Sequence, residues 1–173
     1  MARKGKSFSV GLGPDREPYS QYQRRATEQG FEAAREWDLQ TLPPFPDLIP
    51  PNEARRQIEN GFTVVDPMQQ PILFNDGIFD HWEKEKNYSE KNVNGRLERL
   101  GMARQTVQNP REIWDQGNQR AYVQLFRKKT EGRKGCVVFV HDNNVVITYF
   151  PKNLGELEKV RKGILIKKSE GSA

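Results

Sequence analysis

Two apolar stretches near the C-terminus, joined by a short polar turn, constrain the fold most strongly. Residues 136–141 read CVVFVH and residues 145–150 read VVITYF, with DNN between them. Short β-branched runs around such a turn favour an antiparallel hairpin, because Asp and Asn readily adopt the turn conformations. The first run is apolar at nearly every position, so it is expected to be a central strand with both faces covered. The chain must therefore build a sheet around this hairpin.

Other strand and helix patterns surround this hairpin. Short or alternating apolar runs predict strands at 62–65, 71–74, 120–129 and 164–166. Helical spacing and capping residues predict helices at 52–60, 77–86, 89–107 and 109–116. The last of these rests on Asn109, Pro110 and Glu112, which are typical of a helix start. The order indicates an α+β fold, with N-terminal helices packed on a small antiparallel sheet of about four strands.

The N-terminal part of the chain has a different composition. Residues 1–51 contain seven of the 11 prolines, and residues 42–51 read LPPFPDLIPP. Because proline fixes φ and lacks an N–H group, this stretch is expected to be an extended connector. Residues 19–37 carry a weak helical pattern. We therefore divide the chain into an N-terminal segment, residues 1–60, partly disordered or helical, and a small α+β domain, residues 61–173.

Charge is unevenly distributed along the chain. The net charge is +5, and residues 127–173 carry 11 basic and 5 acidic groups, which gives 11 − 5 = +6 for that part alone. Such a basic region attracts polyanions, nucleic acid first among them, although a solvated lysine-rich surface is the plain alternative. The single cysteine, Cys136, excludes an internal disulfide. No apolar run reaches membrane-spanning length, and no Sec-type signal is present at the N-terminus, so we expect a cytoplasmic protein or one delivered by another route.

Several classes of enzyme are disfavoured by missing motifs. There is no GxGxxG, Walker or GxSxG motif, and two isolated histidines with one cysteine do not suit a zinc site, so no cofactor or metal is expected. Cleavage of RNA needs less apparatus, because the 2′-hydroxyl is an internal nucleophile. A base, an acid and cations for the phosphate suffice. The chain offers such a set in His81, Arg96, Thr148, Tyr149, Lys152 and Arg161.

The order of these elements carries a family resemblance. It consists of FTVVDPMQQPILF, a helix bearing HW, the segment NGRLERLGMARQTVQNPREIW, the hairpin ending in VVITYFPK, and the terminal VRKGILI. The pattern covers about residues 61–168. It resembles the phage-associated nuclease domains of the barnase–EndoU–colicin–RelE-like superfamily, which often lie at the C-terminus of phage head proteins and polymorphic toxins.

The resemblance implies helices followed by a four-stranded sheet, and metal-independent endoribonuclease activity. By matching position it implies active-site roles for His81, Arg96 and Thr148. Candidate substrate-binding residues are Lys152, Arg161, Lys162 and Tyr149. Each has a structural alternative: His81 could pack beside Trp82, Arg96 could form a surface ion pair, Thr148 could be present for strand propensity, and Tyr149 could belong to the core.

Two classes of function remain at this point. The first is a toxin-like or effector-like enzyme that cuts RNA, with tRNA among the candidate substrates, and with an immunity or antitoxin protein as its expected partner. The second is a non-catalytic protein that binds nucleic acid, or a structural adaptor associated with a phage virion. In either case the N-terminal segment is a candidate docking element for a delivery or virion partner.

Overall fold

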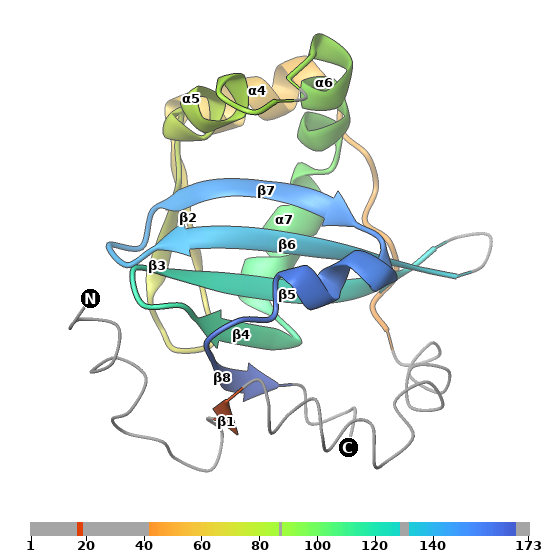
Figure 1. The fold of residues 1–173 in the computed structure, drawn as a ribbon. Coiled ribbons are helices and arrows are strands. Elements are labelled where there is room, and N and C mark those ends of the chain that lie inside the picture. Colours follow the sequence, from red (N-terminus) through yellow and green to blue (C-terminus); the bar gives the residue numbers. More distant parts are fainter. Residues whose placement is uncertain (1–16, 19–41, 87, 129–131, 169–173) are drawn as a thin grey trace.

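The computed structural model describes residues 17–18, 42–86, 88–128 and 132–168. These residues form a six-stranded antiparallel sheet of order β1-β8-β4-β5-β6-β7, a separate hairpin β2-β3 and four α-helices (Figure 1). The α+β class is as predicted, with six strands in the main sheet where about four were expected. The helix expected at 19–37 lies outside the described residues.

The element bounds follow the chain. The strands are β1 (Glu17–Pro18), β2 (Phe62–Val65), β3 (Pro71–Phe74), β4 (Glu112–Asp115), β5 (Gln119–Arg127), β6 (Arg133–His141), β7 (Val146–Lys152) and β8 (Ile164–Lys168). The helices are α4 (Pro51–Asn60), α5 (Gly77–Glu83), α6 (Glu90–Glu98), α7 (Leu100–Gln108) and the 3₁₀ helix η2 (Leu154–Lys159). Most predicted segments thus exist with bounds shifted by a few residues.

The hairpin β6–β7 is the one expected from the sequence. Asn144 in its turn has a φ of 70°, a conformation that asparagine tolerates well. β6 pairs with β5 on one side and β7 on the other, and Val137 and Val138 are buried on opposite faces. β7 is the last strand of the sheet, which explains why Pro151 is tolerated within it.

The pairing of β6 with β7 contains one irregularity. Phe139 pairs with Thr148, but Val140 pairs with Val146, so Ile147 is an extra residue on β7. After such a β-bulge, the side chains of the strand that would have pointed to one face of the sheet point to the other. Val146 therefore packs in the core under the helices, whereas Thr148 shares the other face of the sheet with Phe139.

The helix predicted to start at Asn109 is wrong. Asn109 instead ends α7, and Glu112–Asp115 forms β4, hydrogen-bonded to β5 and β8. Ile113 and Trp114 are both buried, one in each of the two core clusters. A strand can bury consecutive apolar residues on opposite faces, and this tertiary gain overrides the local capping pattern.

The long helix predicted at 89–107 is divided in two. α6 ends and α7 begins around Arg99, whose φ of −101° and ψ of 23° depart from helical values. The predicted apolar stripe is nevertheless buried: Val93, Leu97, Leu100 and Ala103 all lie in the core. α4 is present as expected but begins at Pro51 rather than being capped by Asn52.

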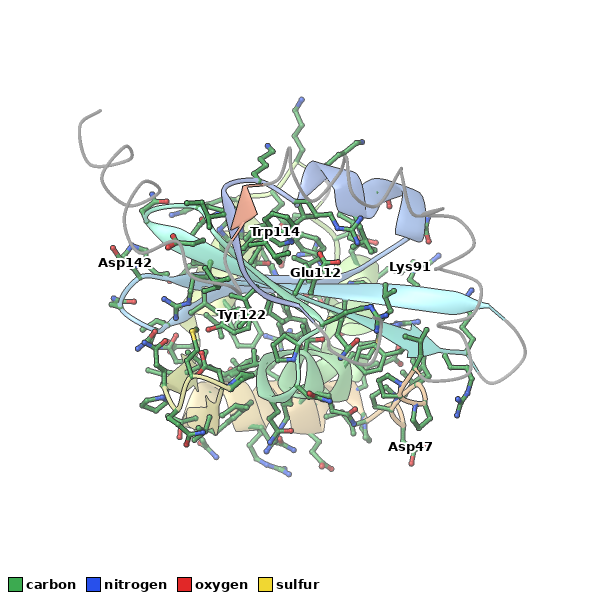
Figure 2. The ribbon with its side chains drawn as sticks, turned by 90° about the horizontal axis from the view of Figure 1, so that it is seen from below. Asp47, Lys91, Glu112, Trp114, Tyr122 and Asp142 are labelled. Atoms are coloured by element: carbon green, nitrogen blue, oxygen red, sulfur yellow. The ribbon has the colours of Figure 1, made fainter. Side chains whose placement is uncertain are left out.

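Apolar side chains cover both faces of the sheet. On one face α7 packs against β5 and β6, with α4, α5 and α6 beyond it at the β7 edge (Figure 1). On the other face Leu157 and Val160 cover part of the sheet together with Leu42. Figure 2 shows Trp114 and Tyr122 amid the strands, whereas Asp142 and Asp47 lie at the periphery.

The proline-rich stretch is extended, as predicted from its composition. The N–H of Phe45 donates to the carbonyl of Arg127 at 2.9 Å, and the N–H of Arg127 donates to the carbonyl of Pro43 at 2.9 Å. These bonds hold Pro43 and Phe45 against the end of β5. The division of the chain at residue 60 stays a prediction.

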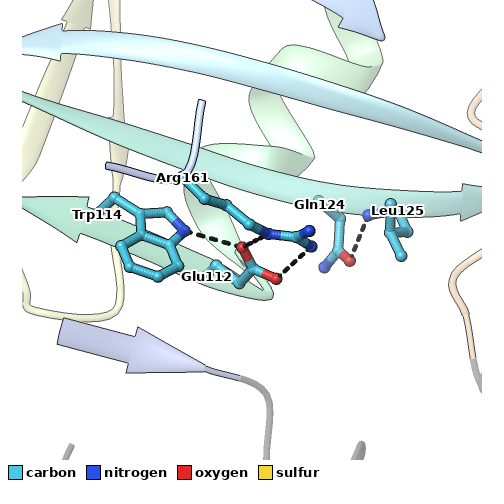
Figure 3. Close-up of polar contacts among 5 residues, drawn as sticks. All are labelled: Glu112, Trp114, Gln124, Leu125 and Arg161. Carbon is cyan, nitrogen blue, oxygen red and sulfur yellow. Dashed lines mark hydrogen bonds and ion pairs between the residues drawn. The ribbon is translucent and has the colours of Figure 1, made fainter. Parts of the chain in front are cut away.

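A buried ion pair joins β4 to the segment before β8. Arg161 Nε and Nη2 donate to Glu112 Oε1 and Oε2 at 2.9 and 2.8 Å, and Trp114 Nε1 donates to Oε1 at 2.9 Å (Figure 3). Arg161 is 5% exposed. Burial alone would raise the pKa of Glu112, but the charge of Arg161 and the hydrogen bonds outweigh it and hold the pKa below its ordinary value. Glu112 is therefore ionised at neutral pH.

We expect Glu112→Ala to lower the free energy of unfolding by about 3–5 kcal/mol, because it leaves the buried Arg161 charge without its partner. The double variant Glu112→Met with Arg161→Met should lose much less, because no buried charge remains. Urea unfolding monitored by tryptophan fluorescence measures both. A single variant as stable as the double variant would show that the ion pair does not hold β4 in place.

The same ion pair predicts a pH dependence. The folded pKa of Glu112 is lowered, so its contribution to stability is fully present above the unfolded-state value of about 4.3 and is lost as the pH falls through the folded pKa. The stability gap between the wild type and Glu112→Gln should therefore be constant near neutrality and shrink below about pH 4.3. Urea unfolding at several pH values tests this, and a gap that widens on acidification would contradict it.

Candidate active site

α5 and the residues just after it bring two proton-transfer groups together. His81 lies on α5, and Glu85 follows one helical turn later. His81 Nε2 lies 3.7 Å from Glu85 Oε2, with the side chains 44% and 26% exposed. An imidazole and a carboxylate thus stand side by side at the surface, where both can reach a ligand.

Arg96 completes this group from the next helix. Its Nη2 lies 2.8 Å from Glu85 Oε1, and its side chain is 20% exposed. The guanidinium also lies over two rings, with Cζ 5.3 Å from the ring centroid of Trp82 and 5.7 Å from that of Phe150. Arg96 therefore connects α5, α6 and β7 through its ion pair and its contacts with the two rings.

Thr148 has a defined structural contact. Trp82 Nε1 donates a hydrogen bond of 2.8 Å to Thr148 Oγ1, and Thr148 is only 3% exposed. This bond satisfies a buried indole N–H and attaches α5 to β7. Thr148 thus contacts Trp82, the residue next to His81, and it positions the helix that carries His81.

Tyr149 and Lys152 lie on opposite faces of β7. Tyr149 is fully buried on the helix side, and its hydroxyl donates to the Arg96 carbonyl at 3.0 Å. Burial raises the pKa of Tyr149 well above its ordinary value, so the hydroxyl stays protonated and anchors α6. Lys152 lies on the other face with Phe150, its Nζ 5.1 Å from that ring centroid.

The remaining predicted residues lie elsewhere. Arg161 is buried against Glu112, so its guanidinium is not offered to a phosphate at the surface. Lys162 is exposed, and its carbonyl accepts from Gln116 Nε2 at 3.4 Å. The chain's other histidine, His141, which was not a predicted site residue, lies at the β6–β7 turn, where its Nδ1 is 2.8 Å from Asp142 Oδ1. The structure therefore groups His81, Arg96, Thr148 and Lys152 around Trp82 and Phe150.

Sequence reasoning missed one member of this site, Glu85, and favoured a core position for another. Glu85 stands four residues after His81, a spacing that brings side chains together on a helix. Only this spacing distinguishes Glu85 from Glu83, which stands two residues after His81 and is not its neighbour on a helix. From the sequence, a core position for Phe150 is favoured over a base-stacking one; in the structure Phe150 is partly exposed beside Arg96.

The group has the chemistry for acid–base work on a phosphate. His81 and Glu85 can give and take protons, and Arg96 retains N–H donors for an anion beside its bond to Glu85. Among the described residues, no three His, Cys, Asp or Glu side chains gather in a way that could hold a metal ion. In the same part of the chain, no helix has the length and apolar character to cross a membrane.

Comparison with known proteins assigns the family. A search of curated proteins and a search of solved structures each found no match to this chain. A family model does match, over residues 52–167 of the 173. The match begins at α4, includes all four α-helices and the two-stranded hairpin, and ends within β8. The chain therefore belongs to the family described as phage-Barnase-EndoU-ColicinE5/D-RelE like nuclease2, a family of nuclease-like domains.

Proposed function

We propose that this protein is an endoribonuclease that cuts RNA by attack of the 2′-hydroxyl on the adjacent phosphate, without a metal ion. The observation that carries the proposal is the group of His81, Glu85 and Arg96 at the surface. Glu85 lies 3.7 Å from His81 Nε2 and 2.8 Å from Arg96 Nη2. Membership in a nuclease family supports the reaction class. The choice of RNA rests on the side chains, which supply proton transfer and a cation for a substrate that carries its own nucleophile.

The proposed reaction assigns one task to each side chain. The phosphate binds Arg96, which already holds Glu85 and has further N–H donors. Glu85 takes the proton of the 2′-hydroxyl as the bond from that oxygen to phosphorus forms. The bond from phosphorus to the 5′-oxygen breaks, and His81 gives that oxygen a proton. The products are a 2′,3′-cyclic phosphate and a 5′-hydroxyl, and Arg96 stabilises the charge on the pentacoordinate phosphorus.

A second candidate is a domain that binds nucleic acid without cutting it. The observation favouring it is the 3.7 Å separation of His81 Nε2 and Glu85 Oε2, which is longer than a hydrogen bond. Ligand binding often tightens such contacts in enzymes, so the distance does not exclude catalysis. Both candidates share the cationic Arg96, and only activity separates them.

The setting of the activity follows from the proposed substrate. RNA, including tRNA, is a cytoplasmic target, and an enzyme that cuts it would harm the cell that makes it. We therefore propose action in the cytoplasm of a producing or target cell, with an immunity or antitoxin protein as partner. A virion or delivery partner for residues 1–60 belongs to the same proposal.

His81→Ala is expected to lower the rate of RNA cleavage by about 100- to 10,000-fold, because a general acid is lost. His141→Ala is the matched control, since His141 is the other exposed histidine and lies outside the group. Neither change should lower stability by more than about 0.5 kcal/mol. Cleavage of total RNA by the purified protein, with and without EDTA, provides the readout.

Three results of that experiment would contradict the mechanism. A fully active His81→Ala protein would remove His81 from the chemistry. Equal losses in His81→Ala and His141→Ala would point to a general effect of removing an imidazole. Loss of activity in EDTA would show that a metal takes part in the reaction.

Arg96→Lys is expected to lower kcat/KM by about 10- to 100-fold, because lysine keeps the charge but loses the planar fork that can hold a carboxylate and a phosphate together. Arg104→Lys is the matched control, because Arg104 also lies over a ring, at 4.6 Å from the centroid of Phe62, but belongs to α7. Steady-state kinetics on a short RNA measures both variants. Similar losses at the two positions would indicate an effect on folding instead.

A further inference from the structure

One face of the sheet carries two aromatic rings beside the candidate active site. Phe139 of β6 and Phe150 of β7 have ring centroids 5.9 Å apart, with an angle of 51° between their planes. Both are partly exposed, whereas their neighbours on this face, Ala121, Val123 and Val137, are buried. The rings therefore lie at the boundary between this core cluster and solvent.

The strand register brings these rings to the proposed chemistry. Phe139 pairs with Thr148, and Phe150 pairs with Val137, so the two rings stand diagonally on one face. Lys152 follows Phe150 by two residues and shares its face. Thr148 in turn holds Trp82, the residue next to His81 in the chain. The aromatic pair is thus continuous with the active-site group.

Positive charge lies directly over one of the rings. Lys152 Nζ is 5.1 Å and Arg96 Cζ is 5.7 Å from the centroid of Phe150. The same Arg96 is the proposed phosphate ligand. A flat ring next to cations matches a nucleotide, which has a planar base and an anionic phosphate within one unit. A purely apolar partner would make no use of the two cations beside the ring.

We propose that Phe150, with Phe139 beside it, is a stacking platform for the nucleobase next to the phosphate held at Arg96. The inference rests on the proposed function and extends it to the substrate class. A base can stack on a ring only when it is free of its neighbours in a duplex, so the platform selects unpaired RNA. Stacking is also tolerant of sequence, so the platform selects for strand state more than for base identity.

The test combines a variant protein with a variant substrate. A short single-stranded RNA is compared with the same RNA carrying an abasic nucleotide beside the cleavage site. For the wild type, the abasic change should raise KM by about 5- to 150-fold, the range expected for loss of one base–aromatic stack. For Phe150→Leu, which keeps apolar packing but removes the flat ring, the abasic change should have almost no further effect.

Two further variants separate stacking from packing. Phe150→Tyr keeps a flat ring, so it should retain the penalty for the abasic substrate. Phe62→Leu is the matched control: Phe62 is partly buried, stacks on Phe74 at 4.8 Å and lies under Arg104, but belongs to β2. It should show the wild-type penalty. Melting temperatures of all variants accompany the kinetics, and Phe139→Leu serves in place of Phe150→Leu if the latter does not fold.

The outcomes distinguish this inference from the proposed function. If RNA is cleaved and the abasic substrate raises KM equally in the wild type and in Phe150→Leu, the stacking platform is overturned. The ribonuclease proposal is unaffected by that result. The protein could instead bind single-stranded RNA without cleaving it, with an abasic nucleotide weakening binding to the wild type but not to Phe150→Leu. That result supports the platform and overturns the ribonuclease proposal. Absence of any base-dependent binding, including capture of a protein partner alone, overturns the platform.

Discussion

The hydrogen bond from Trp82 to Thr148 is the contact on which the rest of the candidate site depends. Trp82 is almost fully buried, and its Nε1 finds its acceptor on the edge strand β7 at 2.8 Å. Leaving such a buried N–H without an acceptor costs about 1–3 kcal/mol, so the bond fixes α5 against that edge. The indole also contacts Tyr149 edge to face and lies under Arg96. One residue therefore sets the positions of the helix with His81, the strand and the cation.

The bulge in β7 determines which side chains of that strand pack in the core under the helices and which lie on the opposite face of the sheet. If Ile147 took part in regular pairing, strict alternation would place Thr148 on the same face as Val146, beneath the helices. With the bulge, Tyr149 faces the helices and holds the Arg96 carbonyl, while Phe150 stays on the partly exposed face. The edge of the sheet is also covered by α5 and α6, which limits its pairing with other chains.

Local patterns predicted much of this architecture, because the hairpin β6–β7 and the stripe of Leu97 and Leu100 depend on neighbours in the chain. The pattern at Asn109 misled because the gain from pairing β4 with β5 and β8 is non-local, and no capping rule contains it. Glu85 was missed for a related reason. Glu85 matters because it pairs with Arg96 of the next helix. The spacing of charges in the sequence cannot show which carboxylate of the run EKEK meets Arg96.

Counting charges along the chain overstated how much of the basic C-terminal part is available to a polyanion. Arg161 belongs to that excess, yet its charge is neutralised inside the protein by Glu112. A buried bidentate pair contributes to holding β4 beside the segment before β8, and it contributes little to the field outside. Lys152, by contrast, is partly exposed beside Phe150. The positive charge offered at the surface therefore depends on where each cation stands relative to the rings and carboxylates of β7 and α5, and not on the sum over the sequence.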